Sequence, residues 1–176
     1  YLRNFEQFKT PKVRIINLCR SYKYLSIGYY CSLLAEARGH RVIPSIKSIN
    51  DLNNKAIYRL NFDNLDKTLQ RVLLKNEANE LFEYQFSFYI YFGNSDTPIL
   101  EHISQHIFEL FPHPILKIEL KFEEKWTVHN IKTISISKLN ERQSTHFADN
   151  LDRFSRNVWS EKKDKQFRYD LAILHD

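Results

Sequence analysis

Residues 13–46 have the sequence VRIINLCRSYKYLSIGYYCSLLAEARGHRVIPSI, and this stretch decides the fold. Its first seven residues are mostly β-branched or apolar, which predicts a strand. Ser26 can cap a helix, and the apolar residues between Tyr29 and Arg38 follow the helical spacing until Gly39, which suits the left-handed end of a helix. Strand character then returns. The order strand, helix, strand predicts a right-handed crossover between two parallel strands.

The chain beyond this segment continues to alternate between helix and strand. The spacing of apolar residues predicts one helix over residues 49–56 and another over residues 65–73. A strict alternation of side chains over residues 84–92 predicts the clearest strand of the chain. After a short turn, Thr97 is placed to cap a further helix, whose apolar stripe extends to Leu110.

The second half of the chain adds a pair of antiparallel strands. Residues 116–122 alternate between apolar and charged side chains, and a second strand begins at Trp126, which predicts a β-hairpin. Asn130 and Lys132 interrupt the apolar face of that second strand, so we expect a bulge or kink there. A last helix is predicted over residues 147–158. The expected fold is a single α/β domain with a mixed, mainly parallel sheet, a Rossmann-like β-α-β start, flanking helices and a β-hairpin in the C-terminal half.

The composition excludes several classes of protein. With 176 residues, of which 43% are hydrophobic and 27% charged, the chain is large enough for one substantial core, and disorder is excluded. Its 26 basic and 21 acidic residues are spread along the sequence without a run of like charges, so nucleic-acid binding is not expected. No segment has the length and apolar character of a membrane span or a signal core. We therefore expect a cytoplasmic protein without a membrane partner.

The cysteines and the two ends of the chain add two expectations. Cys19 should end the first strand and Cys31 should lie inside the following helix, so both are predicted to be buried thiols rather than a disulfide framework. The sequence starts at Tyr1, contains no methionine, and finishes with the apolar run from Leu171 to Leu174, which is typical of a buried strand. These features favour a piece of a longer protein.

Two loops are candidate ligand sites because ligands of α/β proteins bind beyond the carboxyl ends of parallel strands, where helix N-termini favour anions. The first loop, residues 20–28, carries two cations and several hydroxyl groups before a helix start. The second is the turn at residues 93–96. A competing interpretation is that the cations only solvate the first loop while its tyrosines cover the core, since no Gly-rich phosphate fingerprint is present. The candidate anion-binding residues are Arg20, Ser21, Tyr22, Lys23, Tyr24, Ser26 and Gly28 in the first loop, with Asn94 and Ser95 in the second.

Other constellations favour structural roles. His102 and His106 have the one-turn spacing of metal ligands, but they lie off the apolar face and lack a third ligand, so solvent-facing histidines and no metal are predicted. A serine nucleophile motif is absent, and buried thiols would not act as nucleophiles. The aromatic residues of the strand at 84–92 are better explained by core packing than by base stacking.

The segment from Arg14 to Pro44 resembles the N-terminal domain that precedes RimK-like ATP-grasp ligases. The resemblance implies that residues 1–168 form this N-terminal α/β domain and that residues 169–176 are the first strand of the ligase region. Further similarity is found in Tyr58-Arg59-Leu60, Tyr91-Phe92-Gly93, Trp126 and Leu171-Ala172-Ile173-Leu174-His175-Asp176.

The resemblance also implies a parent enzyme that uses ATP and magnesium to activate a carboxylate as an acyl phosphate and then joins it to an amine, as in glutamate ligation. Its nucleotide and metal ligands would belong to the ATP-grasp region, so neither a catalytic residue nor a cofactor is expected in this chain. The implied partners are the C-terminal ATP-grasp domain of the same polypeptide and an acidic or amino-acid substrate.

Two functional hypotheses follow. In the first, the chain is a non-catalytic accessory domain that positions substrate or stabilises the ATP-grasp region. In the alternative, it is an independent anion- or nucleotide-binding module that uses the loop at residues 20–28.

Overall fold

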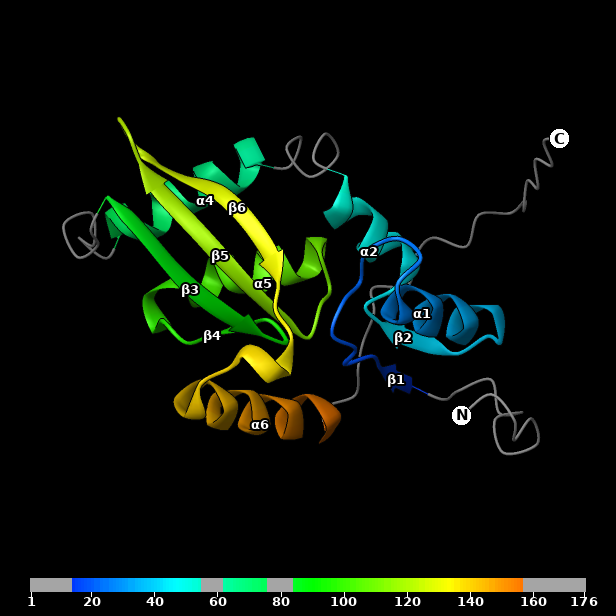
Figure 1. Ribbon diagram of the computed structural model, residues 1–176. Coiled ribbons are helices and arrows are strands. Elements are labelled where there is room, and N and C mark those ends of the chain that lie inside the picture. The colour runs from blue at the N-terminus through cyan, green and yellow to red at the C-terminus, as the bar shows by residue number, and fades with distance from the viewer. Residues whose placement is uncertain (1–13, 55–61, 76–83, 157–176) are drawn as a thin grey trace, which may run out of the picture.

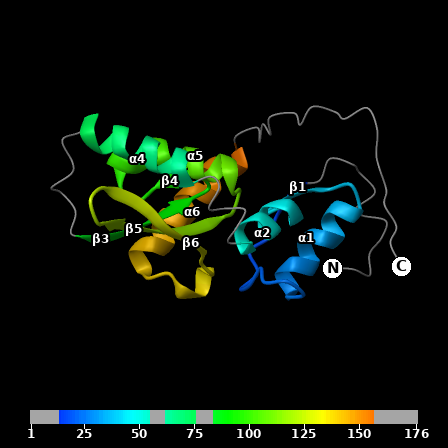
Figure 2. The ribbon, with the colours of Figure 1, turned by 90° about the horizontal axis from the view of Figure 1, so that it is seen from above.

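The computed structural model describes residues 14–54, 62–75 and 84–156, which form two units lying side by side (Figures 1 and 2). The N-terminal unit contains β1 (Arg14–Ile16), α1 (Ile27–Ala37), β2 (Arg41–Ile43) and α2 (Ile46–Asn53). The C-terminal unit contains α4 (Phe62–Lys75), β3 (Gln85–Tyr91), β4 (Asn94–Ser95), α5 (Glu101–Leu110), β5 (Ile115–Phe122), β6 (Trp126–Thr133) and α6 (Glu141–Arg156), with short 3₁₀ helices at Pro98–Leu100 and Ile136–Lys138.

The N-terminal unit has the predicted strand, helix, strand order. Strands β1 and β2 are parallel and pair Ile15 with Val42. The side chain of Ser26 accepts a hydrogen bond from the Tyr29 backbone N–H, so the predicted cap at the start of α1 is confirmed. Gly39 has φ +73°, the left-handed conformation expected at the end of that helix.

A buried asparagine connects the elements of the N-terminal unit. The side-chain amide of Asn17 donates to the Gly28 carbonyl at 2.7 Å and to the Ser32 hydroxyl at 2.9 Å. Ser32 in turn donates to the Pro44 carbonyl at 2.7 Å, just beyond β2. Because every link is buried, loss of one partner would leave polar groups without compensation. The network holds α1 against the ends of both strands.

The larger sheet is antiparallel rather than parallel. Its strand order is β4-β3-β5-β6, and each neighbouring pair runs in opposite directions. The α/β class is thus confirmed, but two sheets replace the single, mainly parallel sheet that was predicted. The strict alternation along β3 is typical of antiparallel strands, whose two faces meet different surroundings, whereas buried parallel strands are apolar on both faces.

The expected bulge lies in β6. Glu119 pairs with Asn130 and Leu120 pairs with Val128, so His129 is the extra residue on the bulged strand. It directly precedes Asn130, one of the two polar residues that predicted the irregularity.

Helices α4 and α5 cover one face of the large sheet, and α6 lies across the end of the sheet next to the turn that follows β3 (Figure 1). The first core contains fully buried side chains such as Leu69 of α4, Ile103 of α5 and Phe88 of β3. The second core gathers Tyr91, Phe92, Ile115 and Phe147, with Ile16 and Leu18 of the N-terminal unit packed against it. None of the helices in the described ranges combines the length and apolar character needed to cross a membrane.

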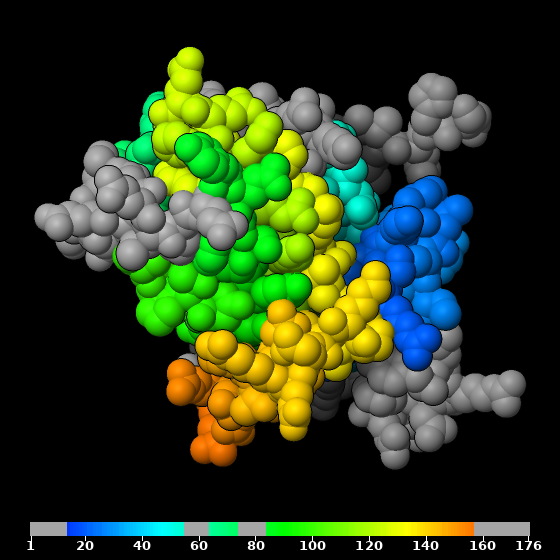
Figure 3. Space-filling view, turned by 60° about the vertical axis from the view of Figure 1, so that its left-hand side comes forward, coloured from blue at the N-terminus to red at the C-terminus, as the bar shows by residue number. Residues whose placement is uncertain are grey.

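A buried histidine lies where the two units meet. Nδ1 of His113 lies 3.1 Å from the hydroxyl of Ser48 on α2, and the Tyr22 ring meets the imidazole edge-on at a centroid distance of 5.7 Å. Burial lowers the pKa of His113 to about 4, so the imidazole is neutral at neutral pH. Figure 3 shows the N-terminal unit, in blue and cyan, against β6 and the segment that follows it, in yellow.

Two expectations about the N-terminal unit were wrong. Cys31 is exposed and Cys19 is half-buried, because α1 presents its small residues rather than its large ones to the rest of the unit. The side of α1 that packs inward consists of Gly28, Ser32 and Ala35. The predicted strand at 171–174 and the end of the predicted last helix lie outside the described residues.

Candidate functional site

The predicted site residues in the loop at residues 20–28 differ in burial: some point into the protein and others are exposed to solvent. Tyr22 is buried, and its hydroxyl donates to the Asn17 carbonyl at 2.6 Å. Arg20, Lys23 and Tyr24 are exposed, as the competing interpretation of the cations proposed. That interpretation is right for Tyr22, which covers the core, and wrong for Tyr24, which is 70% exposed.

The loop before α1 packs against the N-terminal end of the helix and caps it. The Ser26 hydroxyl donates to the Ser21 carbonyl at 2.8 Å and accepts from the Tyr29 N–H at 3.3 Å. A Cβ atom added at Gly28 would lie 2.3 Å from the Ser21 carbonyl oxygen, so the loop rests directly on the helix start. An anion at this loop would therefore be held by the outward side chains of Arg20 and Lys23.

Asn94 and Ser95 lie elsewhere in the molecule. Both belong to β4, at the side of the large sheet away from α1 (Figures 1 and 2). The Ser95 N–H donates to a carboxylate oxygen of Glu101 at 2.7 Å, which fixes the turn to the start of α5. The structure thus does not bring the two predicted loops together. Asn94 instead lines a pocket that the sequence did not indicate.

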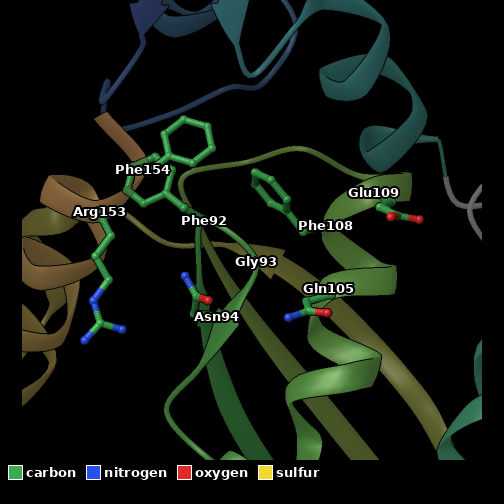
Figure 4. Close-up of a pocket in the computed structure, with 8 residues that line it drawn as sticks. All are labelled: Phe92, Gly93, Asn94, Gln105, Phe108, Glu109, Arg153 and Phe154. Carbon is green, nitrogen blue, oxygen red and sulfur yellow. The ribbon is translucent and has the colours of Figure 1, made fainter. Parts of the chain in front are cut away.

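This pocket has a volume of about 370 Å³, within the range of small-molecule sites, and lies between α5, α6 and the turn that follows β3 (Figure 4). Phe92 and Phe154 stack on its apolar side with ring centroids 4.7 Å apart. We name it the Phe92 pocket; its lining residues are Phe92, Gly93, Asn94, Gln105, Phe108, Glu109, Arg153 and Phe154.

The turn at the base of the Phe92 pocket has unusual backbone geometry. Phe92 has φ +50° and Gly93 has φ +91°, so two consecutive residues are left-handed. Positive φ at both central residues is what the two-residue turn between antiparallel β3 and β4 requires, although it is unfavourable for a bulky residue such as Phe92. A Cβ atom at Gly93 would meet the Phe108 ring at 3.1 Å, so the turn lies close against α5.

The Phe92 pocket offers both signs of charge and an apolar wall. Figure 4 shows Arg153 on one side and Gln105 and Glu109 on the other, with Asn94 between them; the Glu109 carboxylate points away from Arg153. A guanidinium can bind a carboxylate in bidentate fashion, and a carboxylate can bind an ammonium group. The Arg153 guanidinium is therefore the group of this pocket that suits a carboxylate ligand. Arg153 and Glu109 lie on different helices, so the sequence carried no signal that they share a site.

A buried tyrosine lies next to this turn. The Tyr91 hydroxyl has no hydrogen-bond partner in the described part of the chain. Burial, followed by the nearby Asp96 carboxylate, raises the pKa of this hydroxyl above its usual range. Burial also raises the pKa of Asp96, although hydrogen bonds from the Tyr89 N–H and the Thr97 hydroxyl oppose the shift.

Two other surfaces show no comparable arrangement. A second hollow, of about 450 Å³, lies over β3, β5 and β6, but its charged groups engage one another, as in the ion pair of Lys117 with Glu119 at 3.6 Å. His102 is exposed, as predicted, and His106 is half-buried. Within residues 14–54, 62–75 and 84–156, no cluster of three or more His, Cys, Asp or Glu side chains could hold a metal ion.

Comparison with known proteins gives one result. A sequence model of the RimK-like ATPgrasp N-terminal domain matches residues 1–150, which include both units apart from the last turns of α6. No curated protein and no solved structure matches the chain. Since the match spans most of the sequence, the chain belongs to the RimK-like ATP-grasp N-terminal domain family.

Proposed function

We propose that the chain is the non-catalytic N-terminal accessory domain of an ATP-dependent carboxylate–amine ligase of the glutamate type. The observation that carries this proposal is the family match over residues 1–150. In this proposal residues 1–168 are the accessory domain and residues 169–176 lead into the ATP-grasp region, where ATP and magnesium bind. The enzyme acts in the cytoplasm.

The Phe92 pocket supports a role in positioning substrate. Arg153 would bind the carboxylate of an amino acid or peptide. The phenyl groups of Phe92 and Phe154 would cover the apolar part. A ligase that joins carboxylates to amines uses substrates of this class.

An exposed apolar surface supports a role in stabilising the ATP-grasp region. Five of the six large hydrophobic side chains exposed in the described residues lie within ten residues around the start of α1. Large apolar patches of this kind mark contact surfaces, and tyrosine is enriched at the energetic centres of interfaces. We name this set the α1 surface and assign it to contact with the ATP-grasp region; it consists of Tyr24, Leu25, Ile27, Tyr30 and Leu33.

The alternative is an independent anion- or nucleotide-binding module. Arg20 and Lys23 are exposed at the loop before α1, so an anion in solution could reach both side chains. In this alternative ATP or another anion would bind the isolated chain through these two side chains. The turn at Asn94 and Ser95 would not contribute, since it lies at the other unit.

Calorimetry of the chain with ATP, glutamate and short acidic peptides distinguishes these roles. The accessory role predicts no ATP binding, and any peptide binding should be lost in Arg153→Gln. Binding of ATP that disappears in Arg20→Ala and Lys23→Ala would support the independent module and refute the accessory role. Lys47→Ala, at an exposed lysine of α2, is the matched control for loss of a surface charge.

A further inference from the structure

The two cysteines of the chain lie next to each other at one end of the N-terminal unit. Cys19 follows β1, and Cys31 lies in the second turn of α1. Their Sγ atoms are 3.8 Å apart, and both thiols are free. Cys31 is exposed, so a reagent in solution can reach the pair.

The fold holds this arrangement from both sides. The Cys19 N–H donates to the side-chain oxygen of Asn17 at 3.1 Å, and Asn17 also binds the Gly28 carbonyl of α1. A Cβ atom at Gly28 would lie 2.9 Å from Cβ of Cys19, which shows how closely α1 approaches this residue. The hydrogen bonds of Asn17 and the absence of a side chain at Gly28 place α1 directly against the end of β1. This packing brings the two sulfur atoms together.

We propose that Cys19 and Cys31 form a thiol–disulfide exchange site that reacts with low-molecular-weight disulfides and closes into an intrachain disulfide. The Cys31 thiolate attacks one sulfur of the small disulfide, forms a mixed disulfide and expels one small thiolate. The Cys19 thiolate then attacks the Cys31 sulfur, forms the Cys19–Cys31 bond and expels the second. The protein loses two electrons and two protons, and the small disulfide becomes two thiols.

The order of the two steps follows from the surroundings of each thiol. Burial, followed by the hydrogen bond to Cys31, raises the pKa of Cys19, so its thiolate is scarce in the reduced chain. Cys31 is the exposed group and makes the first attack. Once Cys31 carries the mixed disulfide, the neighbouring Cys19 is in position to resolve it.

Closing this bond would alter the surface around α1. The disulfide would enclose residues 20–30, which include the loop cations and much of the α1 surface. To form this bond the two sulfur atoms must approach from 3.8 Å to about 2.05 Å. This inference stands on the thiol geometry and does not depend on the proposed function.

The test uses oxidised glutathione as the small disulfide, with intact mass and free-thiol titration of the 176-residue chain as readouts. The wild-type chain should lose two hydrogen atoms and both titratable thiols without a lasting glutathione adduct. Cys19→Ser should stop with one glutathione attached to Cys31. Cys31→Ser should react at least about tenfold more slowly, because only the half-buried thiol remains.

A second measurement separates a site held by the fold from two reactive thiols in any chain. Resolution of the mixed disulfide should be at least about tenfold faster in the folded chain than in urea, because the fold holds the sulfur atoms together. Equal rates in the two states would overturn the proposal. So would a lasting adduct on the wild-type chain, or disulfide-linked dimers as the main product.

Discussion

Gly28 is the residue at which the loop before α1 and the helix itself approach most closely. In Gly28→Ala, the new methyl group would lie 2.3 Å from the Ser21 carbonyl oxygen, which is backbone and cannot simply rotate away. We expect the free energy of unfolding to fall by about 1–3 kcal/mol, the usual cost of overpacking. Urea denaturation of the chain measures it.

The control for this substitution is Gly39→Asn. Gly39 has φ +73° and open space around its Cα, and asparagine tolerates the left-handed conformation. Its free energy of unfolding should stay within about 1 kcal/mol of the wild-type value. If the two variants were equally stable, the close contact at Gly28 would be wrong.

His113 makes the stability of the chain depend on pH. The unfolded chain binds a proton at this residue below its usual pKa of 6.5, whereas the folded chain binds it only near pH 4. Protonation therefore favours the unfolded state between these values. The free energy of unfolding should fall by about 1.4 kcal/mol for each pH unit as the pH drops through this window.

The variant His113→Gln isolates this contribution. Other titrating groups, including Asp96, remain in both proteins, so the difference between the two pH profiles reports the imidazole alone. The difference should be largest near neutral pH and shrink as the pH falls from 6.5 to 4. Parallel profiles in urea titrations would contradict a neutral, buried His113.

Some of these residue-level features could be predicted from the sequence. Ser26 and Gly39 behave as expected because a cap and a left-handed helix end depend on local backbone geometry. Thr97 makes no side-chain cap hydrogen bond, since a short 3₁₀ turn starts there and its hydroxyl binds Asp96. The exposure of Cys31 could not be predicted, because it depends on which side of α1 the rest of the unit covers.

At the scale of single elements, α6 begins with a reciprocal cap. The side-chain oxygen of Asn140 accepts from the Gln143 N–H at 2.9 Å, and the Gln143 side-chain oxygen accepts from the Asn140 N–H at 3.0 Å. Asn140→Ala removes the arm in which the Asn140 side chain accepts, whereas the arm that uses its backbone N–H remains. We expect the free energy of unfolding to fall by about 1 kcal/mol, with Asn140→Ser close to the wild type in urea denaturation.

Helix α1 shows where apolar periodicity misleads. Its spacing predicted the helix correctly, but the face that packs inward contains Gly28, Ser32 and Ala35, while Ile27 is 77% exposed. Small residues allow the helix to approach the strands closely and leave the larger side chains outside. Periodicity indicates that a helix has two faces, but it does not tell which one the same domain buries.

The α1 surface gives a prediction with a clear control. The double variant Ile27→Ser and Tyr30→Ser should leave the unfolding midpoint of the isolated chain nearly unchanged, since both side chains are exposed. In the whole polypeptide it should lower the thermal midpoint of the ATP-grasp region. Tyr84→Ser removes an exposed aromatic outside this surface and should change neither value.

If the double variant and Tyr84→Ser gave the same midpoint for the ATP-grasp region, the α1 surface would not be its contact.

Strand β3 is an element whose sequence pattern predicted more than its secondary structure. Its alternation over residues 84–92 predicted the strand, and the same alternation already favoured an antiparallel neighbour. The prediction of one mainly parallel sheet assumed that the parallel pairing of β1 and β2 continues into the later strands. In the structure this pairing is limited to these two short strands.

At the scale of the whole molecule, the sequence could indicate the family and the order of elements but not the Phe92 pocket. That pocket depends on α5 and α6 meeting at the turn after β3, a contact between segments more than forty residues apart. The two loops chosen from the sequence belong to different units. Long-range packing, rather than any local pattern, brings Arg153 and Glu109 to the same pocket.

In the proposed function the chemistry takes place in the ATP-grasp region, and this domain positions the substrate and stabilises that region. Amino-acid-dependent release of ADP by the whole polypeptide, measured with and without residues 1–156, tests this division most directly. We expect ATP turnover by the whole polypeptide, a clear loss when the domain is removed, and none by the isolated chain. Absence of ATP turnover with every amino-acid substrate, or turnover by the isolated chain, would contradict it.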